Sequence, residues 1–164
     1  MLIKKGAEAN LYLEDWHNRK VILKRRLSKE YRITEIDKKI RSQRTVHEPQ
    51  IIHKAKEAGV PTPTIYMIDI PNATIIMEFI EGKQIKQILS SLSPEERRDL
   101  CQHIGNLIGR LHTHEIIHGD LTTSNMILTP NGKVVFVDFG LSEHSAELET
   151  RGVDLHLMKR AFQS

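Results

Sequence analysis

The 164-residue sequence has almost no cysteine, no long apolar run and little net charge. Its one cysteine, Cys101, excludes an internal disulfide framework and is typical of a reducing compartment. The first residues contain no apolar segment of the secretory type, and no run approaches the roughly 20 residues of a membrane span. These absences argue against disulfide-rich secreted proteins and membrane-spanning proteins. We therefore expect a cytoplasmic protein with no membrane partner.

The formal net charge of +3 is unevenly distributed along the chain. Between Arg19 and Val60, called the basic segment below, 13 Lys/Arg stand against 5 Asp/Glu, which gives a local charge of +8 and leaves −5 for the remainder. A run of this kind is either a solvated face or a contact for an anionic partner. Charge alone leaves both interpretations open.

The residues with the clearest chemistry lie between His118 and Gly140. Asp120 is followed five residues later by Asn125 in the string His-Gly-Asp-Leu-Thr-Thr-Ser-Asn, and Asp138 opens an Asp-Phe-Gly turn after an apolar run. Phosphoryl transfer requires a carboxylate that orients the nucleophile and oxygen ligands that hold Mg²⁺ on the ATP phosphates. Asp120 is the candidate catalytic residue, and Asn125 and Asp138 are the candidate metal ligands. The alternative is that all three are turn and capping residues, but both halves seldom occur together at this spacing.

The first half of the sequence predicts short strands around one helix. Apolar, β-favouring runs alternate with polar turns, and Gly59, Pro61 and Pro63 end the helical stretch. The predicted strands lie at 11–13, 21–23, 65–70 and 73–80, the helix at 42–58, and a hairpin turn at Pro71-Asn72. Short strands with one inserted helix are the layout of a protein kinase amino-terminal lobe.

Lys24 ends the strand Val-Ile-Leu-Lys, which resembles the kinase pattern V-A-I-K. In that pattern the lysine contacts the ATP phosphates and pairs with a helix glutamate, for which Glu48 is the candidate. Pro49 follows Glu48 directly, and proline is tolerated mainly in the first helical turn, so Glu48 is predicted near the start of its helix. The alternative for Lys24 is an exposed lysine at a strand end.

Two further segments stand where a kinase contacts ATP. The turn Gly6-Ala7-Glu8-Ala9 occupies the place of the glycine-rich loop, but its single glycine lets the backbone amides approach phosphates less freely. The strand with Met77 and Glu78 runs into a glycine-containing connector, where the Glu78 carbonyl and the Ile80 N–H would bond the adenine. A plain surface turn and an edge strand are the alternatives.

From Ser93 onward the pattern becomes helical. Ser93-Pro94-Glu95-Glu96 reads as a capping box with proline at the first helical position. Apolar residues then follow at spacings of three and four: Leu100, Ile104, Leu107, Ile108 and Leu111. His112, His114 and His118 have no cysteine or carboxylate cluster at ligand spacing, so we do not expect zinc. Instead, His118 is predicted to pack and to orient the catalytic loop.

Strands at 126–128 and 134–137 are predicted to form a hairpin around the turn Pro130-Asn131-Gly132. This hairpin would present Asn125 and Asp138 at the same point. The predicted fold is therefore α+β, two-lobed and protein-kinase-like. Residues 1–80 would form the N-lobe, an antiparallel sheet with one helix, and residues 81–164 a shortened, mostly helical C-lobe, with ATP in the cleft between the lobes.

The second half departs from ordinary protein kinases. Gly119 stands where those enzymes usually carry the arginine that reads an activation-loop phosphate, and Thr122 stands where many place a lysine on the γ-phosphate. Only eleven residues, Leu141 to Arg151, separate Asp-Phe-Gly from the last apolar helix, and no Ala-Pro-Glu occurs. The residues for ATP are present, whereas a platform for a peptide substrate is largely missing.

Over nearly its whole length the sequence resembles the small atypical kinase subunit of the KEOPS complex, a relative of the RIO kinases. The most specific match is the intact string from His118 to Asn125. The other matching segments are Lys5 to Ala9, Lys29 with Tyr31-Arg32, Arg44-Thr45 with Glu48, Ala58 to Pro63, Met77-Glu78 with Ile80 to Gly82, Asp138 to Ser142, and Gly152 to Leu155.

The resemblance implies a serine/threonine kinase or ATPase that uses ATP and Mg²⁺, with Mn²⁺ as an alternative metal, and supports threonylcarbamoyladenosine modification of tRNA. The implied partners are the catalytic subunit of that complex, a small regulatory subunit bound through the N-lobe, and tRNA on the basic surface. Contacts to the tRNA phosphates would contribute binding affinity but no sequence specificity. The family continues with further helices and a basic tail that this sequence lacks. The last helix is apolar on several sides, at Leu155, Leu157, Met158 and Phe162, so we expect it to be buried. Either the sequence is a truncated form, or a partner or a second copy covers this surface.

Two other interpretations stay open at this point. Small-molecule phosphotransferases of the aminoglycoside or choline kinase type share His-Gly-Asp with an asparagine at +5, but they add a substrate-binding region that this sequence is too short to hold. A non-catalytic nucleotide-binding scaffold is favoured by the glycine-poor loop and by the awkward place of Pro49. ATP turnover by Asp120 and Asp138 variants separates a scaffold from an enzyme.

Overall fold

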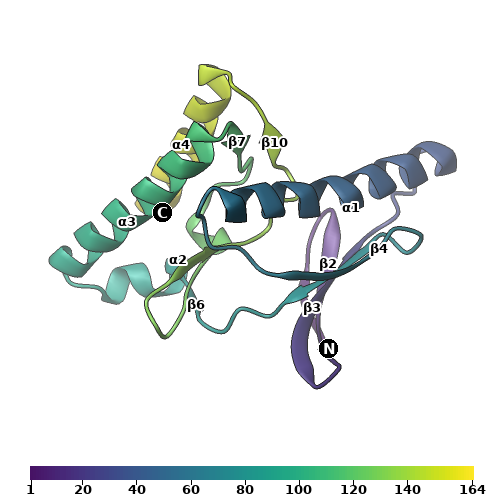
Figure 1. The fold of residues 1–164 in the computed structure, drawn as a ribbon, viewed down its shortest axis with the longest axis horizontal. Helices are drawn as coiled ribbons and strands as arrows, with labels where there is room; N and C mark the ends of the chain where they lie inside the picture. The colour runs from purple at the N-terminus through teal and green to yellow at the C-terminus, as the bar shows by residue number, and fades with distance from the viewer. The chain divides into compact units, whose positions relative to one another are not determined.

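The fold is described from a computed structural model that covers residues 1–164. The chain divides into two compact units, which we describe separately (Figure 1). The first unit comprises Met1–Gln50 and Pro63–Phe79, and the second comprises Ile51–Thr62 and Ile80–Ser164. No helix combines the length and the apolar character that a membrane span requires.

The first unit is built on a five-stranded antiparallel sheet with the strand order β1-β2-β3-β5-β4. Its strands are β1 (Leu2–Lys5), β2 (Ala9–Trp16), β3 (Arg19–Arg26), β4 (Ile65–Asp69) and β5 (Thr74–Glu78). The predicted α+β class, with an antiparallel sheet and one long helix, is confirmed. β1 was not predicted: it is a four-residue edge strand whose residues are all exposed, so it lacks the apolar alternation that marks a strand in sequence.

The helix α1 (Thr34–Glu57) begins eight residues before the predicted start at residue 42. Its first turn is stabilised by Asp37, whose carboxylate accepts the Lys29 backbone N–H at 3.2 Å and pairs with Arg41 Nε at 2.7 Å and Arg32 Nη1 at 3.5 Å. These are polar contacts with residues near in sequence, and the neighbouring Ile36 is half-exposed, so apolar periodicity did not reveal this turn.

The prediction that Glu48 lies near the helix start is wrong. Pro49 lies inside α1, and the helix begins 14 residues before Glu48. A proline within a helix removes one backbone hydrogen bond, here to the Thr45 carbonyl, at a cost of about 3 kcal/mol relative to alanine. Pro49 is buried, and the buried Ile51 and Ile52 follow it, so apolar burial along this part of α1 offsets the cost.

The second unit contains one long helix, a shorter terminal helix and two small sheets. Its elements are β6 (Lys83–Gln84), α2 (Ile85–Ile88), η1 (Leu89–Ser91), α3 (Pro94–Thr113), β7 (Ile116–Ile117), η2 (Thr123–Asn125), β8 (Met126–Leu128), β9 (Val134–Phe136), β10 (Glu143–His144) and α4 (Leu148–Gln163). The small sheets have the orders β6-β8-β9 and β10-β7. The predicted helix after Ser93 and the predicted hairpin are both present.

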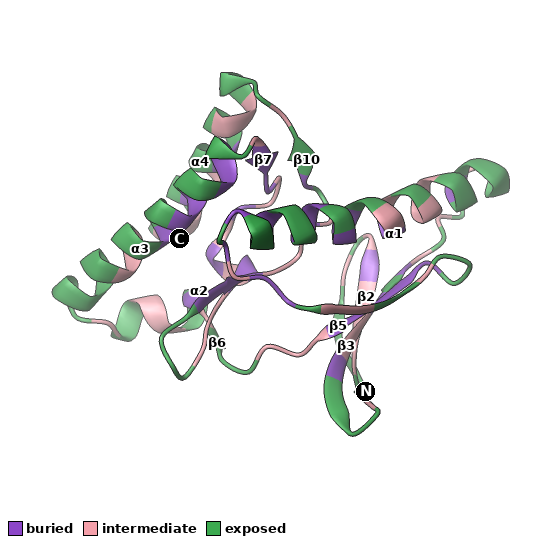
Figure 2. Ribbon diagram, in the orientation of Figure 1, coloured by how far each residue is buried: buried purple, intermediate pink, exposed green.

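The capping box of α3 forms as the sequence predicts. Glu96 N–H donates to Ser93 Oγ at 3.2 Å, and Ser93 N–H donates to Glu96 Oε2 at 2.8 Å. The apolar face of α3 then contributes Ile104, Leu107, Ile108 and Leu111 to the core. Figure 2 shows β7 as buried and the outward turns of α3 as exposed.

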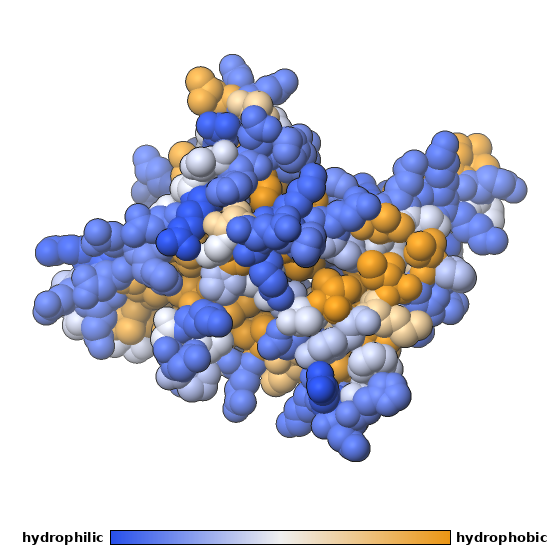
Figure 3. Space-filling view, in the orientation of Figure 1, coloured by the Kyte–Doolittle hydropathy of each residue, from blue (hydrophilic) through white to orange (hydrophobic).

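Most of the face drawn in Figure 3 is hydrophilic, with an apolar area over α1 and β4. The exposed isoleucine and methionine side chains on or directly beside these two elements are Ile33, Ile36, Met67, Ile68 and Ile70. A separate exposed set lies on and before α4, where Leu141, Leu148, Val153 and Leu155 are all more than half exposed. Of the residues predicted to need cover on this helix, Met158 is buried within the chain, and Leu157 and Phe162 are half-buried.

Candidate active site

In the first unit, Glu48 of α1 forms two buried ion pairs with β3. Lys24 Nζ lies 2.8 Å from Glu48 Oε1, and Arg26 Nη2 lies 2.5 Å from Glu48 Oε2. The Lys24, Arg26 and Glu48 side chains are 7%, 3% and 2% exposed, so water screens these pairs little. The predicted Lys24–Glu48 contact is therefore present, although Glu48 reaches it from the interior of α1.

The contribution of Arg26 was missed from the sequence. Alternate residues of a strand point to the same face, so Arg26, two positions after Lys24, lies on the same face of β3 as Lys24. Arg26 also donates from Nη2 to the Arg44 carbonyl of α1 at 3.3 Å. The two-residue spacing of Lys24 and Arg26 on one strand was the signal that could have identified it, and the structure shows both residues buried and Arg25 between them exposed.

The turn Gly6-Ala7-Glu8-Ala9 connects β1 to β2, the place expected for a phosphate-covering loop. Gly6 N–H donates to the Ala9 carbonyl at 3.0 Å, and a Cβ at Gly6 would lie 2.6 Å from that oxygen, so the one glycine is required by the turn itself. Glu8 Oε2 pairs with Arg44 Nη1 of α1 at 2.7 Å, and Lys29 Nζ donates to the Ala7 carbonyl. Side-chain contacts thus hold this turn in place.

The predicted adenine-binding residues lie at the end of β5 and just after it. Met77 is buried, and Glu78 N–H donates to the Thr64 carbonyl at 2.8 Å while its carboxylate accepts the Thr64 N–H at 2.9 Å. This two-way contact fixes Glu78 beside the start of β4. Ile80 belongs to the second unit and is half-buried there.

In the second unit, the predicted catalytic and metal-binding residues are brought together. Asn125 Nδ2 donates to Asp120 Oδ2 at 2.8 Å and to the Asp120 carbonyl at 2.9 Å. Val137 N–H donates to the Asn125 carbonyl at 2.9 Å. Asp138 is the next residue, so this hydrogen bond holds its backbone close to that of Asn125. Asp138 has φ +62°, a left-handed conformation that is uncommon for a residue with a side chain and often marks functional positions.

His118 lies fully buried beneath this loop. Asp120 N–H donates to His118 Nδ1 at 3.3 Å, so Nδ1 is unprotonated and Nε2 carries the proton that is shared with the Val137 carbonyl at 3.1 Å. Burial lowers the pKa of His118, although the charge of Asp154 opposes that effect, and the imidazole is therefore neutral near pH 7. The ring packs on Phe139 with a centroid distance of 4.6 Å. As predicted, His118 orients the segment that bears Asp120.

Asp154 of α4 is the second residue whose contribution was missed. It is fully buried and accepts hydrogen bonds from His118 N–H at 2.9 Å, Gly119 N–H at 3.0 Å and His112 Nε2 at 3.0 Å. Burial would raise the pKa of Asp154, but these hydrogen bonds outweigh it and hold that pKa below its usual value. An aspartate within an apolar helix was the available signal, because a buried charge needs partners.

The structure explains why position 119 carries no arginine. Gly119 has φ +83°, and a Cβ placed there would lie 2.0 Å from the Leu141 carbonyl oxygen. No side chain fits without movement of the backbone after the Asp-Phe-Gly turn. The close passage of Leu141 therefore excludes the residue that other kinases use to read a phosphate.

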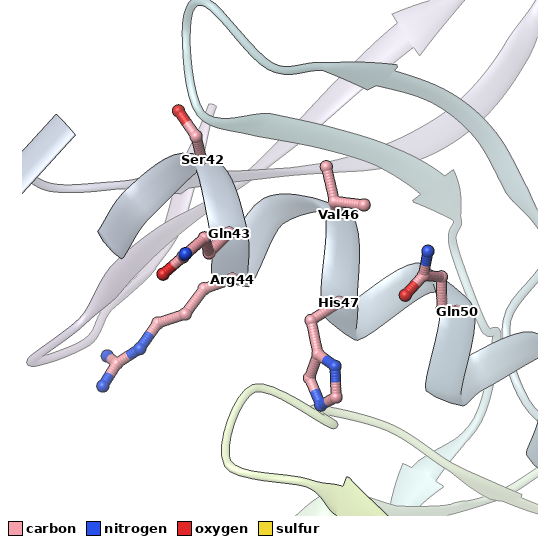
Figure 4. A pocket seen from close by; sticks show the side chains of 6 residues that line it. All are labelled: Ser42, Gln43, Arg44, Val46, His47 and Gln50. Atoms are coloured by element: carbon pink, nitrogen blue, oxygen red, sulfur yellow. The ribbon is translucent and has the colours of Figure 1, made fainter. Parts of the chain in front are cut away.

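An open hollow lies along α1. It is lined by Ser42, Gln43, Arg44, Val46, His47 and Gln50. Figure 4 shows the Gln43, Arg44 and His47 side chains extending to one side of the helix. Arg44 is already engaged with Glu8, and we assign no ligand to this hollow.

Comparison with known proteins decides the family. Residues 6–158 match the protein kinase domain. The chain is also 50% identical to "KEOPS complex subunit Bud32" of Pyrococcus abyssi, over an alignment that covers 99% of this chain and 76% of that protein. The chain belongs to the Bud32 family. This confirms the resemblance inferred from the motifs. A second Bud32 protein, from Dictyostelium discoideum, is 42% identical over the whole chain and 68% covered.

Two further comparisons place the Bud32-family domain in a wider setting. A "probable bifunctional tRNA threonylcarbamoyladenosine biosynthesis protein" of Methanothermobacter thermautotrophicus is 46% identical over 99% of this chain, which spans 29% of that protein. Among solved structures, the Rio2 kinase from Chaetomium thermophilum superposes with a TM-score of 0.76 at 18% identity, covering 97% of this chain and 54% of that one. This likeness confirms the kinase-like fold.

Proposed function

We propose that this Bud32-family chain is an atypical Mg²⁺- and ATP-dependent phosphotransferase, with ATPase activity, that acts as a subunit of the KEOPS complex. The observation that supports the proposal is the arrangement of Asp120, Asn125 and Asp138. The Asn125 amide donates a hydrogen bond to the Asp120 carboxylate, and Asp138 follows Val137, whose N–H donates to the Asn125 carbonyl. A scaffold without catalysis has no need of a carboxylate fixed in this way.

The residues present fit a magnesium ion. Mg²⁺ takes oxygen ligands, and it is usually held by one or two carboxylates together with substrate phosphates. The Asn125 amide nitrogen is engaged by Asp120, so its oxygen is the atom that would face a metal, and Asp138 would add a carboxylate. When bound, the ion would neutralise charge on the β- and γ-phosphates. Mn²⁺ has similar preferences and is an alternative.

In this proposal Asp120 orients the nucleophile. Asn125 fixes one of its carboxylate oxygens, and the neutral His118 fixes its backbone N–H, so the carboxylate is held in place before substrate arrives. The segment from Leu141 to the start of α4 is short and contains the two-residue strand β10 rather than a peptide platform. We therefore propose water, or a hydroxyl group brought close by a partner, as the acceptor.

The other predicted nucleotide contacts keep their proposed roles. Lys24, held by Glu48, would contact the α- and β-phosphates, and the turn Gly6-Ala7-Glu8-Ala9 would cover them. Met77, Glu78 and Ile80 would receive the adenine. The division into lobes at residue 80 and a cytoplasmic location likewise remain predictions.

We propose three macromolecular partners. The names of the relatives support a complex that makes threonylcarbamoyladenosine on tRNA, so the first partner is its catalytic subunit and the second is a small regulatory subunit on the first unit. The third is tRNA on the basic segment, with its local charge of +8. Because phosphate contacts release counterions, tRNA binding should weaken steeply between low and physiological salt. Binding that is indifferent to salt would count against this contact.

Phosphate release tests the enzymatic proposal. The chain should hydrolyse ATP slowly with Mg²⁺, and Asp120→Ala and Asp138→Ala should each reduce that rate by about 100-fold or more, as the loss of a positioned acid–base group or metal ligand does. Turnover unchanged in both variants would favour the scaffold. Asp99→Ala, at an exposed position of α3, is the matched control and should behave as the wild type.

A further inference from the structure

Two cationic side chains of the first unit contact the turn between β1 and β2. Arg44 Nη1 of α1 lies 2.7 Å from Glu8 Oε2, and Lys29 Nζ donates to the Ala7 carbonyl. Both cations lie in segments that match the family, and the proposed function gives neither of them a role. They connect the turn to α1 and to the segment that precedes α1.

Both cations are themselves held in place. The Arg44 carbonyl accepts a hydrogen bond from Arg26 Nη2 at 3.3 Å. The Lys29 backbone N–H donates to Asp37 Oδ1 at 3.2 Å, and Asp37 Oδ2 pairs with Arg41 Nε at 2.7 Å. The two side chains therefore reach the turn from fixed positions on or beside α1.

Hydrogen bonds also orient the peptide groups of the turn. The Ala7 carbonyl accepts from Lys29 Nζ, and the Glu8 carbonyl accepts from Leu27 N–H at 3.1 Å. In a trans peptide the carbonyl and the following N–H point in opposite directions, so the Glu8 and Ala9 N–H groups point away from these donors. Backbone N–H groups in a turn are common phosphate ligands. Contacts from outside the turn thus fix the direction of its amides, although it has a single glycine.

We propose that the ion pair between Glu8 and Arg44 holds this turn closed over the nucleotide phosphates. The two side chains are 41% and 37% exposed, so the pair can open without leaving a buried charge unpaired. Glu8 and Arg44 are therefore positioning residues that set the rate at which the nucleotide leaves. This inference rests on the proposed function, since it assumes that the turn covers the phosphates.

The competing interpretation is that Arg44 binds the phosphates directly and that Glu8 competes with them for Arg44. The contacts of Lys29 and Leu27 favour our proposal, because they hold the same turn through its carbonyls. The two interpretations differ in the effect of Glu8→Gln. If the pair holds the turn, this change frees the turn and speeds nucleotide release. If Glu8 competes, the change leaves Arg44 to the phosphates and slows release.

The test measures the dissociation rate of ADP that carries a fluorescent N-methylanthraniloyl group, in the presence of Mg²⁺. Arg44→Gln and Glu8→Gln should each speed release by about two- to fivefold, the effect of one exposed ion pair. The affinity for adenosine, which lacks phosphates, should stay unchanged in both variants. Arg44→Lys should release the labelled ADP within about 1.5-fold of the wild-type rate, because it keeps a cation for Glu8. Lys39→Gln, which removes an exposed cation of the same helix, is the matched control and should have no effect.

A double-mutant cycle tests whether the two residues act as a pair. In a Glu8→Gln background, Arg44→Gln should have little further effect on release of the labelled ADP. Because salt screens an exposed pair, the ratio of the Arg44→Gln rate to the wild-type rate should fall toward one at about 1 M salt. Slower release from Glu8→Gln, an undiminished effect of Arg44→Gln in that background, or an equal loss of adenosine affinity would overturn the inference.

ATP turnover separates this inference from the proposed function. If Arg44→Gln and Glu8→Gln leave the release rate unchanged while Asp120→Ala still abolishes ATP turnover, the inference fails and the proposed function stands. If the wild type neither binds the labelled ADP nor hydrolyses ATP, the proposed function fails and the inference fails with it.

Discussion

Replacement of Asp154 by asparagine should loosen the loop that bears Asp120 and destabilise the fold. Asp154 Oδ2 accepts from His118 N–H and His112 Nε2, and Oδ1 accepts from Gly119 N–H. An asparagine has one acceptor oxygen, so in either orientation its NH₂ group faces at least one buried N–H that loses its partner.

The magnitude follows from these contacts. A buried donor left without a partner costs about 1–3 kcal/mol, and the remaining bonds lose the assistance of the negative charge. We expect Asp154→Asn to lower the free energy of unfolding by about 2–4 kcal/mol, which a domain with a typical stability of about 5–15 kcal/mol would survive. ATP turnover should fall with it, because Gly119 and His118 precede Asp120 directly.

The pH dependence gives an independent signature. The folded-state pKa of Asp154 is depressed, so its contribution to stability is present above the unfolded pKa of about 4 and is lost as pH falls through the lower folded value. Asp154→Asn removes a titrating group and should abolish that part of the acid loss.

The assay is urea unfolding of wild type and variant at neutral pH and at several acidic pH values. Asp99→Asn, the same change at an exposed position of α3, should alter stability by less than about 0.5 kcal/mol. The reasoning is refuted if Asp154→Asn is as harmless as Asp99→Asn, or if it keeps the full acid dependence of the wild type.

Three further predictions concern single residues. Gly119→Ala should lower the free energy of unfolding, measured by heat or urea, by about 2–3 kcal/mol, because φ is strained for alanine and the new Cβ would clash with the Leu141 carbonyl. Gly105→Ala, in open space on α3, should instead raise the free energy of unfolding by about 0.5–1 kcal/mol. Because burial depresses the pKa of His118, stability should decline as pH falls below the ordinary histidine value of about 6.5, and His118→Gln should remove that part of the decline. Pro49→Ala should raise the free energy of unfolding by about 1–3 kcal/mol by restoring a hydrogen bond of α1, while Pro94→Ala, at the first position of α3, should change it little. Equal effects of the two proline changes, or of the two glycine changes, would contradict these accounts.

Much of the fold was predictable because it depends on patterns among residues that are close in sequence. The capping box before α3, the turn at residues 130–132 and the apolar runs of β3, β8 and β9 each depend on residues close in sequence. The Asp120–Asn125 contact was predictable for the same reason, since its five-residue spacing keeps both groups in one loop.

The missed features depend on contacts between residues far apart in sequence. Asp154 meets its partners 35 to 42 residues away, and Arg26 meets Glu48 22 residues away. Pro49 gave a misleading local signal, because the rule that places proline at helix starts was overridden by burial in α1. In each case tertiary packing decided what the sequence pattern alone could not.

The most direct test of the central claim is ATP turnover by the chain alone and then with the catalytic subunit of the complex and tRNA. We expect slow, Mg²⁺-dependent phosphate release by the chain alone and a clear increase with both partners present, with Asp120→Ala and Asp138→Ala abolishing both rates. A rate that the partners leave unchanged, or that survives in both variants, would contradict the assignment of this site to an ATP-dependent step in tRNA modification.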